Sequence, residues 1–239
     1  METQWKEKKL DFGITNSSIW SNLSTATSNG SMNASIESFK PLQIAIMMLN
    51  MGMGEVILGG VGTGTITLIA FMILTTFIAG LMIGKAPEFL GKKIENYDIK
   101  MVLIILLTTP FCVLVTSAIS MLYPETINLI DNSAHGFTQL MYTFISTGAN
   151  NGSSMTGFIA NTTLLNITLI ICMLATRFIP MYGALKLSEN LSKKKIVFNS
   201  NTSLKMYKPV FQIMLIIMII IIGALTFLPV IFLGPLAHL

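Results

Sequence analysis

The chain has 239 residues, of which 52% are hydrophobic and only 11% are charged, and its mean hydropathy is +0.71. The surface of a soluble domain needs about 25% charged residues, so this composition excludes a soluble enzyme, a nucleic-acid binder and a disulfide scaffold. The net charge of +4 comes mostly from lysines in short loops, where it indicates membrane orientation rather than an anionic partner.

The first long apolar stretch, 41–84, is too long to be one straight membrane helix. At 1.5 Å per residue it would measure about 66 Å, whereas the hydrocarbon core is about 30 Å thick. Glu55 lies in the first half of this stretch, and a cluster of glycines follows it. We expect a broken inner helix whose hinge or gate contains Gly59, Gly60, Gly62 and Gly64, because glycine-rich sequence disfavours helix. Close helix packing without motion is the alternative.

Four segments are long and apolar enough to cross a bilayer as helices. They are 65–84, 101–123, 155–185 and 209–233. These runs lack the alternation of barrel strands, and lipid permits only helices or closed barrels. The sequence therefore predicts an all-α polytopic membrane protein.

The loops carry a clear charge asymmetry. Loops 85–100 and 186–208 contain many lysines, whereas the connection 124–136 has neither Lys nor Arg. The positive-inside rule then places the first two loops in the cytoplasm and the C-terminus outside. Lys6, Lys8 and Lys9 would lie outside, which conflicts with the rule.

The segment 136–154 starts and ends on the outer side in this topology. Its apolar part, 137–147, is too short to span, and Gly148-Ala-Asn-Asn-Gly-Ser-Ser154 is too polar to face lipid. Irregular backbone at membrane depth is tolerated only where it lines a cavity or is buried in protein. We therefore expect a re-entrant pore loop.

A similar loop occurs 122 residues earlier. Ser24-Thr-Ala-Thr-Ser-Asn-Gly-Ser31 matches Ser146-Thr-Gly-Ala-Asn-Asn-Gly-Ser153 at five of eight positions, which indicates an internal repeat. The first pore loop would occupy about 18–34. The counterpart of helix 101–123 would precede Met1, so on internal evidence the chain resembles the end of a longer one.

The two loops carry the candidate ion-binding residues. Backbone carbonyls can replace the water shell of a cation, and glycine allows close approach. The candidates are Asn29, Gly30, Ser31, Asn150, Asn151, Gly152 and Ser153, with ordinary polar turns as the alternative. Arg177, the only arginine, either extends to the cytoplasmic interface or sets a positive charge in the inner mouth of a cation path.

The chain resembles the family of potassium-binding A subunits (KdpA) of the Kdp potassium-transporting ATPase. The matching stretches, in family order, are Ser28-Asn-Gly-Ser-Met-Asn-Ala34, Gly54-Glu-Val-Ile-Leu-Gly-Gly-Val-Gly-Thr-Gly64, Phe77-Ile-Ala-Gly-Leu-Met-Ile-Gly84, Pro87-Glu-Phe-Leu-Gly-Lys-Lys-Ile94, Ala149-Asn-Asn-Gly-Ser153, Arg177-Phe178 and Gly223-Ala-Leu-Thr-Phe227. They cover essentially the whole chain and correspond to about the C-terminal half of the family's polypeptide.

The resemblance implies a pore-loop fold of the potassium-transporter superfamily. Residues 1–100 would form the third pore repeat without its outer helix, 101–200 the fourth, and 201–239 a C-terminal transmembrane helix. In the fourth repeat, helix 101–123 is the outer helix, 136–154 the pore loop and 155–185 the inner helix.

The resemblance also implies a non-catalytic subunit in the bacterial plasma membrane. Its filter would bind potassium as the only metal, and the chain would hold no cofactor. ATP hydrolysis would belong to the B subunit, with small C and F subunits, the missing N-terminal half and membrane lipid as further partners. Ala149 and Thr65-Ile-Thr67 depart from the family pattern at the filter and the gate. A passive channel, an ion-coupled symporter subunit and a non-conducting remnant are the alternatives.

Overall fold

The computed structural model describes residues 13–53, 56, 59–60, 62–84, 86–123, 133–159, 161–196, 206 and 208–238. The helices are α1 (Ile14–Ala26), α2 (Pro41–Gly52), α3 (Thr63–Ile83), α4 (Asn96–Met121), α6 (Ala134–Gly148), α7 (Thr163–Lys193) and α8 (Pro209–Leu233), with 3-10 turns η1 (Ile36–Ser38) and η2 (Pro235–His238). A short antiparallel hairpin pairs β1 (Glu88–Phe89) with β2 (Lys92–Lys93).

Four of the described helices are long and apolar enough to cross a membrane. They are α3, α4, α7 and α8, the last continuing through η2 to Ala237. Helices α1, α2 and α6 have 13, 12 and 15 residues, fewer than the roughly 20 that a span requires. The predicted all-α polytopic membrane fold is confirmed.

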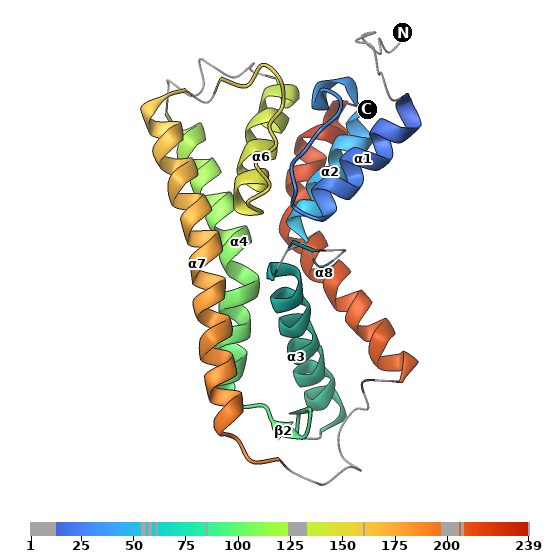
Figure 1. Ribbon diagram of the computed structural model, residues 1–239, viewed down its shortest axis with the longest axis vertical. Helices are drawn as coiled ribbons and strands as arrows, with labels where there is room; N and C mark the ends of the chain where they lie inside the picture. The colour runs from blue at the N-terminus through green and yellow to red at the C-terminus, as the bar shows by residue number, and fades with distance from the viewer. Residues whose placement is uncertain are drawn as a thin grey trace.

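The three short helices α1, α2 and α6 lie at the upper end of the molecule (Figure 1). Helices α4 and α7 lie side by side over the full height, and α6 lies beside them in the upper half. Helices α1 and α2 occupy the upper half on the other side, with α3 below them and α8 crossing both levels. The C-terminal ends of α1 and α6 therefore lie near the middle of the molecule.

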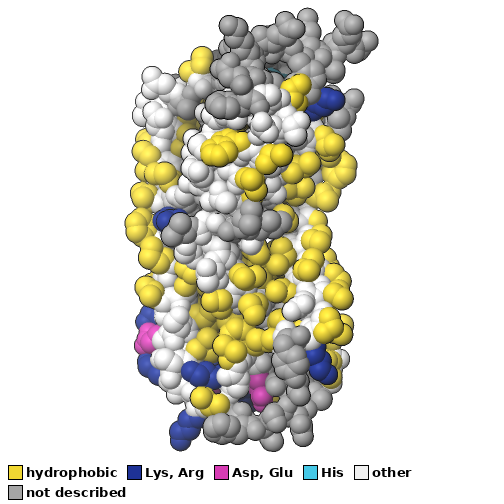
Figure 2. Space-filling view, turned by 45° about the vertical axis from the view of Figure 1, so that its right-hand side comes forward, with side chains coloured by type: hydrophobic (Ala, Val, Ile, Leu, Met, Phe, Trp, Pro, Cys, Tyr) yellow, Lys and Arg dark blue, Asp and Glu magenta, His cyan; other side chains and the backbone are white. Residues whose placement is uncertain are grey.

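The two lysine-rich segments lie at the same end of the molecule, as the predicted topology requires. The hairpin, the end of α7 and the start of α8 are at the lower end, whereas the C-terminus is at the upper end (Figure 1). Figure 2 shows hydrophobic side chains over the middle of one face, with several basic and acidic side chains at the lower end.

The long stretch 41–84 is broken in the structure. Helix α2 ends at Gly52, and α3 begins at Thr63 after Gly62, whose φ of 85° is in the left-handed region. The predicted break reached Gly64, which was wrong: Gly64 lies in the first turn of α3, and its N–H donates to the Gly60 carbonyl at 3.2 Å. Glu55 lies outside the described residues.

Two other helices begin elsewhere than predicted. Helix α4 starts at Asn96 rather than 101, because Glu95 and Asp98 form a capping box at its N-terminus. Helix α7 was predicted at 155–185 but runs from Thr163 to Lys193. The described residues between the second loop and Thr163 are not helical. Thr162 caps the N-terminus of α7, where its hydroxyl accepts from the Leu165 N–H at 3.3 Å.

The far end of α7 continues beyond the apolar segment. Glu189 pairs with Lys186 at 3.0 Å and with Lys193 at 2.7 Å, at helical spacings. Such pairs stabilise an exposed helix, which explains why residues predicted as loop are helical.

A buried ion pair joins the lower ends of α4 and α7. Asp98 is fully buried, pairs with Lys194, and accepts from the Asn190 amide at 2.6 Å. Lys92 in β2 donates to the Leu191 carbonyl at 2.7 Å. The hairpin is thereby fixed to the end of α7, a feature that the sequence did not predict.

Candidate functional site

The two predicted loops have the same backbone geometry, 122 residues apart. Helix α1 ends at Ala26 and α6 at Gly148. After each helix, a backbone N–H of the loop donates a hydrogen bond to the equivalent carbonyl of the helix. The Asn29 N–H donates to the Ser24 carbonyl at 3.0 Å, and the Asn151 N–H donates to the Ser146 carbonyl at 2.8 Å. The loops also have left-handed residues at matching positions.

Those left-handed residues reverse the direction of the chain. Ser28 and Asn150 have φ values of 56° and 53°, and Gly30 and Gly152 have 77° and 81°. Side chains disfavour this region by about 1–2 kcal/mol per residue, so a glycine at the second position removes the strain. A short helix that reverses into a Gly-centred loop at mid-height is the geometry expected of a re-entrant pore loop.

The two loops contact one another directly. The Ser28 hydroxyl donates to the Ala149 carbonyl at 2.5 Å, and the Asn151 amide donates to the Ser24 carbonyl at 3.5 Å. The Asn151 carbonyl oxygen lies against the Cα of Gly30. The structure therefore brings the two predicted loops together, although they are 122 residues apart, with Gly30 and Asn151 in direct contact.

The side chains of the second loop point into the protein. Asn151 and Ser153 are 6% and 7% exposed. The Asn151 Oδ1 atom accepts from the Ser153 N–H at 3.1 Å, from the Ser153 hydroxyl, and from the Ser146 hydroxyl at 3.3 Å. These bonds occupy the Asn151 side-chain oxygen and fix the shape of its own loop.

The first loop is more open than the second. Asn29, Ser31 and also Gly152 are exposed, whereas Gly30 and Asn150 are half-buried. The Asn150 amide donates to the Thr176 hydroxyl of α7 at 3.3 Å and thereby links the second loop to the helix that carries Arg177.

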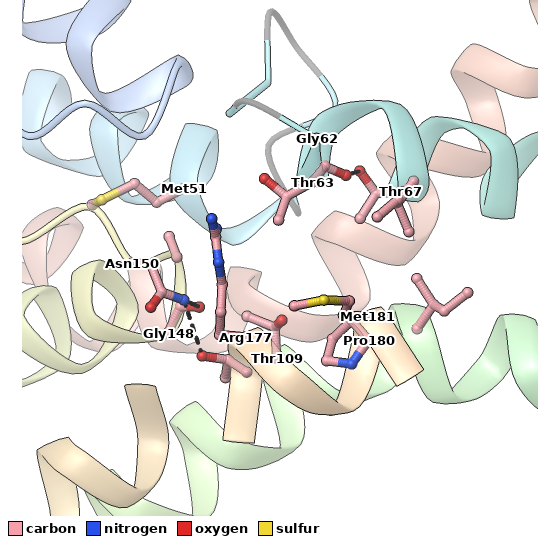
Figure 3. A pocket seen from close by; sticks show the side chains of 14 residues that line it. Met51, Gly62, Thr63, Thr67, Thr109, Gly148, Asn150, Arg177, Pro180 and Met181 are labelled. Atoms are coloured by element: carbon pink, nitrogen blue, oxygen red, sulfur yellow. Dashed lines mark hydrogen bonds between the residues drawn. The ribbon is translucent and has the colours of Figure 1, made fainter. Parts of the chain in front are cut away.

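A cavity of about 770 Å³ connects the loops with the glycine-rich break. Its lining comes from the ends of α1 and α6, the start of α3, and α7: Thr27, Ser28, Asn29, Gly59, Gly60, Thr63, Ala149, Asn150 and Arg177. A second cavity of about 220 Å³ continues between α3, α4 and α7, where it is lined by Thr67, Thr109, Pro180 and others. Figure 3 shows this second space.

Arg177 extends from α7 into the space between Asn150 and Thr63 (Figure 3). Sixteen residues separate it from the end of α7 at Lys193, which is about 24 Å along a helix. No ion pair of Arg177 occurs among the described residues. Of the two interpretations of Arg177, this placement favours a positive charge in the cavity over a side chain that extends to the cytoplasmic interface.

The cavity has opposite electrostatic ends. The C-terminal ends of α1 and α6 carry partial negative charge and favour a cation, whereas the N-terminal end of α3 carries partial positive charge. Arg177 lines the cavity together with both Asn150 and Thr63 and adds a full positive charge between these two ends. The helix ends next to the loops therefore give a potential that favours positive charge, and the helix end next to the glycine-rich break gives the opposite potential.

Several residues of this site were missed in the sequence. Ser28 was not singled out, although it lies 122 residues before Asn150, and Thr176 directly precedes Arg177. The repeat offset could have identified Ser28. Thr176 could not have been found, because its role depends on the distance between a loop and α7.

The comparisons with known proteins agree on one family. The model of the family described as "Potassium-transporting ATPase A subunit" (KdpA) matches residues 1–239. Curated relatives named "Potassium-transporting ATPase potassium-binding subunit" include one from Clostridium botulinum strain Alaska E43, 46% identical over 97% of this chain, and one from Clostridium perfringens strain ATCC 13124, 45% identical over 97%. One from Desulfovibrio desulfuricans is 44% identical over 97% of this chain. The chain spans about 40% of the length of these relatives.

Proposed function

Because the chain belongs to the KdpA family of potassium-transporting ATPase A subunits, we propose that it binds potassium and forms part of its path in an ATP-driven import complex of the bacterial plasma membrane. The relatives are named as potassium-binding subunits. The observation that carries the proposal is the pair of loops after α1 and α6, which have left-handed residues at matching positions and contact one another near the middle of the molecule.

Potassium would bind to backbone oxygens of residues 29–31 and 150–153. The C-terminal ends of α1 and α6 add favourable potential at this place, and the side chain of Asn151 holds its own loop in shape. Potassium would then pass into the larger cavity toward Gly59, Gly60, Gly62 and Arg177, which would form the gate. Gly64 would support the gate from the first turn of α3.

Other parts of the complex would cover the loop residues that are exposed in the described structure. Loop residues such as Asn29, Ser31 and Gly152 are exposed, and their loops follow the ends of α1 and α6 near the middle of the molecule. At that depth lipid cannot satisfy backbone polar groups. We infer that other protein covers them, namely the N-terminal half of the family's polypeptide, which would bring the two further pore repeats. The B subunit would hydrolyse ATP, and the C and F subunits would complete the assembly.

The orientation follows from the charges. The hairpin and the lower end of α7 would face the cytoplasm by the positive-inside rule, and the C-terminus would lie outside. The loops would then open to the outer side, and the cavity with Arg177 to the cytoplasmic side, which is the order that an importer needs.

Ion competition in the complete complex tests this proposal. Gly152→Ser places a side chain at a φ of 81°, with no protein atom within 4 Å of the new Cβ. It should weaken potassium affinity and increase the uptake of rubidium or sodium relative to potassium. Gly84→Ser is the matched control, because Gly84 has a φ of 70° and equal open space but lies at the far end of α3.

The two variants separate the possible outcomes. A changed ion preference in Gly152→Ser alone supports the filter. Equal behaviour of both variants at wild-type affinity would contradict it and leave an ordinary polar turn. Uptake that persists without ATP would instead favour a passive channel or an ion-coupled symporter.

A further inference from the structure

An aromatic side chain on each half-helix bonds to the returning part of its own loop. The Trp20 indole N–H donates to the Ser31 carbonyl at 3.1 Å, and the Tyr142 hydroxyl bonds to the Ser153 hydroxyl at 2.9 Å. Trp20 and Tyr142 are 122 residues apart, as are Ser31 and Ser153. The same bond therefore recurs at equivalent positions in both loops, with different chemical groups.

The chain geometry explains the spacing of 11 residues in each pair. Each aromatic residue lies six residues before the end of its half-helix, at Ala26 or Gly148, which is about 9 Å along the helix axis. Extended chain covers about that distance in three residues. After the turn, the serine is therefore level with the aromatic residue, and a long side chain can bridge the gap.

The bridge from Tyr142 belongs to a fully buried network. Tyr142 is 0% exposed and Ser146 is 1% exposed. The Ser153 hydroxyl contacts both the Ser146 hydroxyl, at 3.4 Å, and the Asn151 Oδ1 atom. One phenol thus supports the hydroxyl that fixes the side chain next to Gly152. Buried polar networks are rigid when all members are bonded, and leaving one member unpaired is costly.

The bridge from Trp20 is of a different kind. It binds the carbonyl of Ser31 rather than a hydroxyl, and Trp20 is 48% exposed. This bond orients one backbone oxygen of the first loop directly. It involves no further side chain of the loop in the described structure, so its loss should disturb the first loop less widely.

We propose that Trp20 and Tyr142 are positioning residues for ion selection, and that the Tyr142 hydroxyl sets the discrimination between potassium and rubidium. This inference rests on the proposed function. The phenol acts through Ser153 and Asn151, so it fixes where the backbone oxygens of the second loop lie without touching the ion. A filter whose oxygens are free to move adapts to ions of other sizes.

Tyr142→Phe in the complete complex tests this role, since it keeps the ring and removes only the hydroxyl. The apparent potassium affinity should fall by about 2- to 10-fold, which corresponds to one net hydrogen bond. The preference for potassium over rubidium should fall as well, while the maximal rate at saturating potassium stays near wild type. Trp20→Phe should change both quantities in the same direction but less.

A double-mutant cycle distinguishes positioning from general packing. Ser153→Ala should have at least the effect of Tyr142→Phe, because it also removes the contacts of that hydroxyl with Ser146 and Asn151. The double variant should be no worse than Ser153→Ala alone, because the bond to Tyr142 is already lost in it. Tyr182→Phe is the matched control: Tyr182 is 58% exposed on α7, away from the loops. A packing defect would lower the melting temperature of the complex without changing ion preference.

The outcomes also separate this inference from the proposed function. An unchanged ion preference in Tyr142→Phe, together with a changed one in Gly152→Ser, would overturn the positioning role and leave the filter in place. Unchanged preference in both variants would contradict the filter itself. Additive effects of Tyr142→Phe and Ser153→Ala would also contradict the positioning role.

Discussion

The Asn151 carbonyl oxygen occupies the space that a side chain at Gly30 would need. A Cβ at position 30 would lie 2.0 Å from that oxygen and 2.9 Å from the Asn151 carbonyl carbon, both backbone atoms. Neither atom can move without shifting the second loop. The two loops thus pack directly against one another, with Gly30 of the first loop in contact with the Asn151 carbonyl of the second.

This contact predicts unequal effects for the two equivalent glycines. Gly30→Ala should displace the second loop and abolish high-affinity uptake. Gly152→Ala meets no atom within 4 Å, so it should add only backbone strain of about 1–2 kcal/mol and leave measurable uptake with altered affinity. Potassium uptake by the complete complex at several concentrations measures both. Similar, mild effects of the two substitutions would contradict the observed contact.

The Ser28 hydroxyl provides a second link between the loops. Ser28→Ala removes the bond to the Ala149 carbonyl and should weaken apparent potassium affinity by about 2- to 10-fold, the range for one net hydrogen bond. Thr27→Val is the control, because the Thr27 hydroxyl bonds to Leu23 and Ser24 carbonyls of its own helix. The apparent potassium affinity should fall in Ser28→Ala and stay near wild type in Thr27→Val. A fall in Thr27→Val alone would contradict this link.

Much of this arrangement could be predicted from the sequence, and the reasons for the misses are physical. The bounds of α8 equal the predicted 209–233, because an uninterrupted apolar run after Pro209 leaves no alternative. Helix α7 was predicted to start at 155, eight residues before its observed start at Thr163. The reason is that an apolar segment returning from a loop has the same composition as the start of a membrane-spanning helix. The candidate residues of both loops were identified from the repeat, but contacts such as that of Gly30 with Asn151 depend on how α1 and α6 are placed in space.

Arg177 should affect the rate of transport rather than the choice of ion. Two unit charges about 10 Å apart repel by about 1.7 kcal/mol at an effective dielectric constant of 20. Arg177→Ala should therefore speed the passage of potassium past the inner mouth by about 15- to 20-fold. Time-resolved uptake by the complete complex measures the rate, and rubidium competition measures the preference. A changed preference at an unchanged rate would assign Arg177 to the filter instead.

The buried pair of Asp98 and Lys194 should matter for stability and not for ion binding. Removing one partner of a buried pair costs about 3–5 kcal/mol, so Asp98→Ala should clearly lower the melting temperature of the complex. The exposed pair of Glu189 with Lys193 offers the control Glu189→Ala, which should change the melting temperature little. Equal melting temperatures for the two variants would contradict the buried placement of Asp98.

The proposed orientation can be tested with impermeant reagents. Lys193 is the better target, because its side chain is 70% exposed, whereas Lys92 is bonded to the Leu191 carbonyl. In intact cells an impermeant amine reagent should not modify Lys193, and a tag after Leu239 should be accessible. Inverted membranes should show the opposite pattern, and labelling of Lys193 from outside would reverse the topology.

The most direct test of the account is to locate the ion. In the complete complex, a structure determined with rubidium or thallium in place of potassium should show the ion between the two loops, coordinated by backbone oxygens of residues 29–31 and 150–153. The ion should be absent from that place in the Gly30→Ala complex. An ion bound elsewhere, with both loops unoccupied and in contact only with protein, would contradict the assignment of these loops as the potassium site.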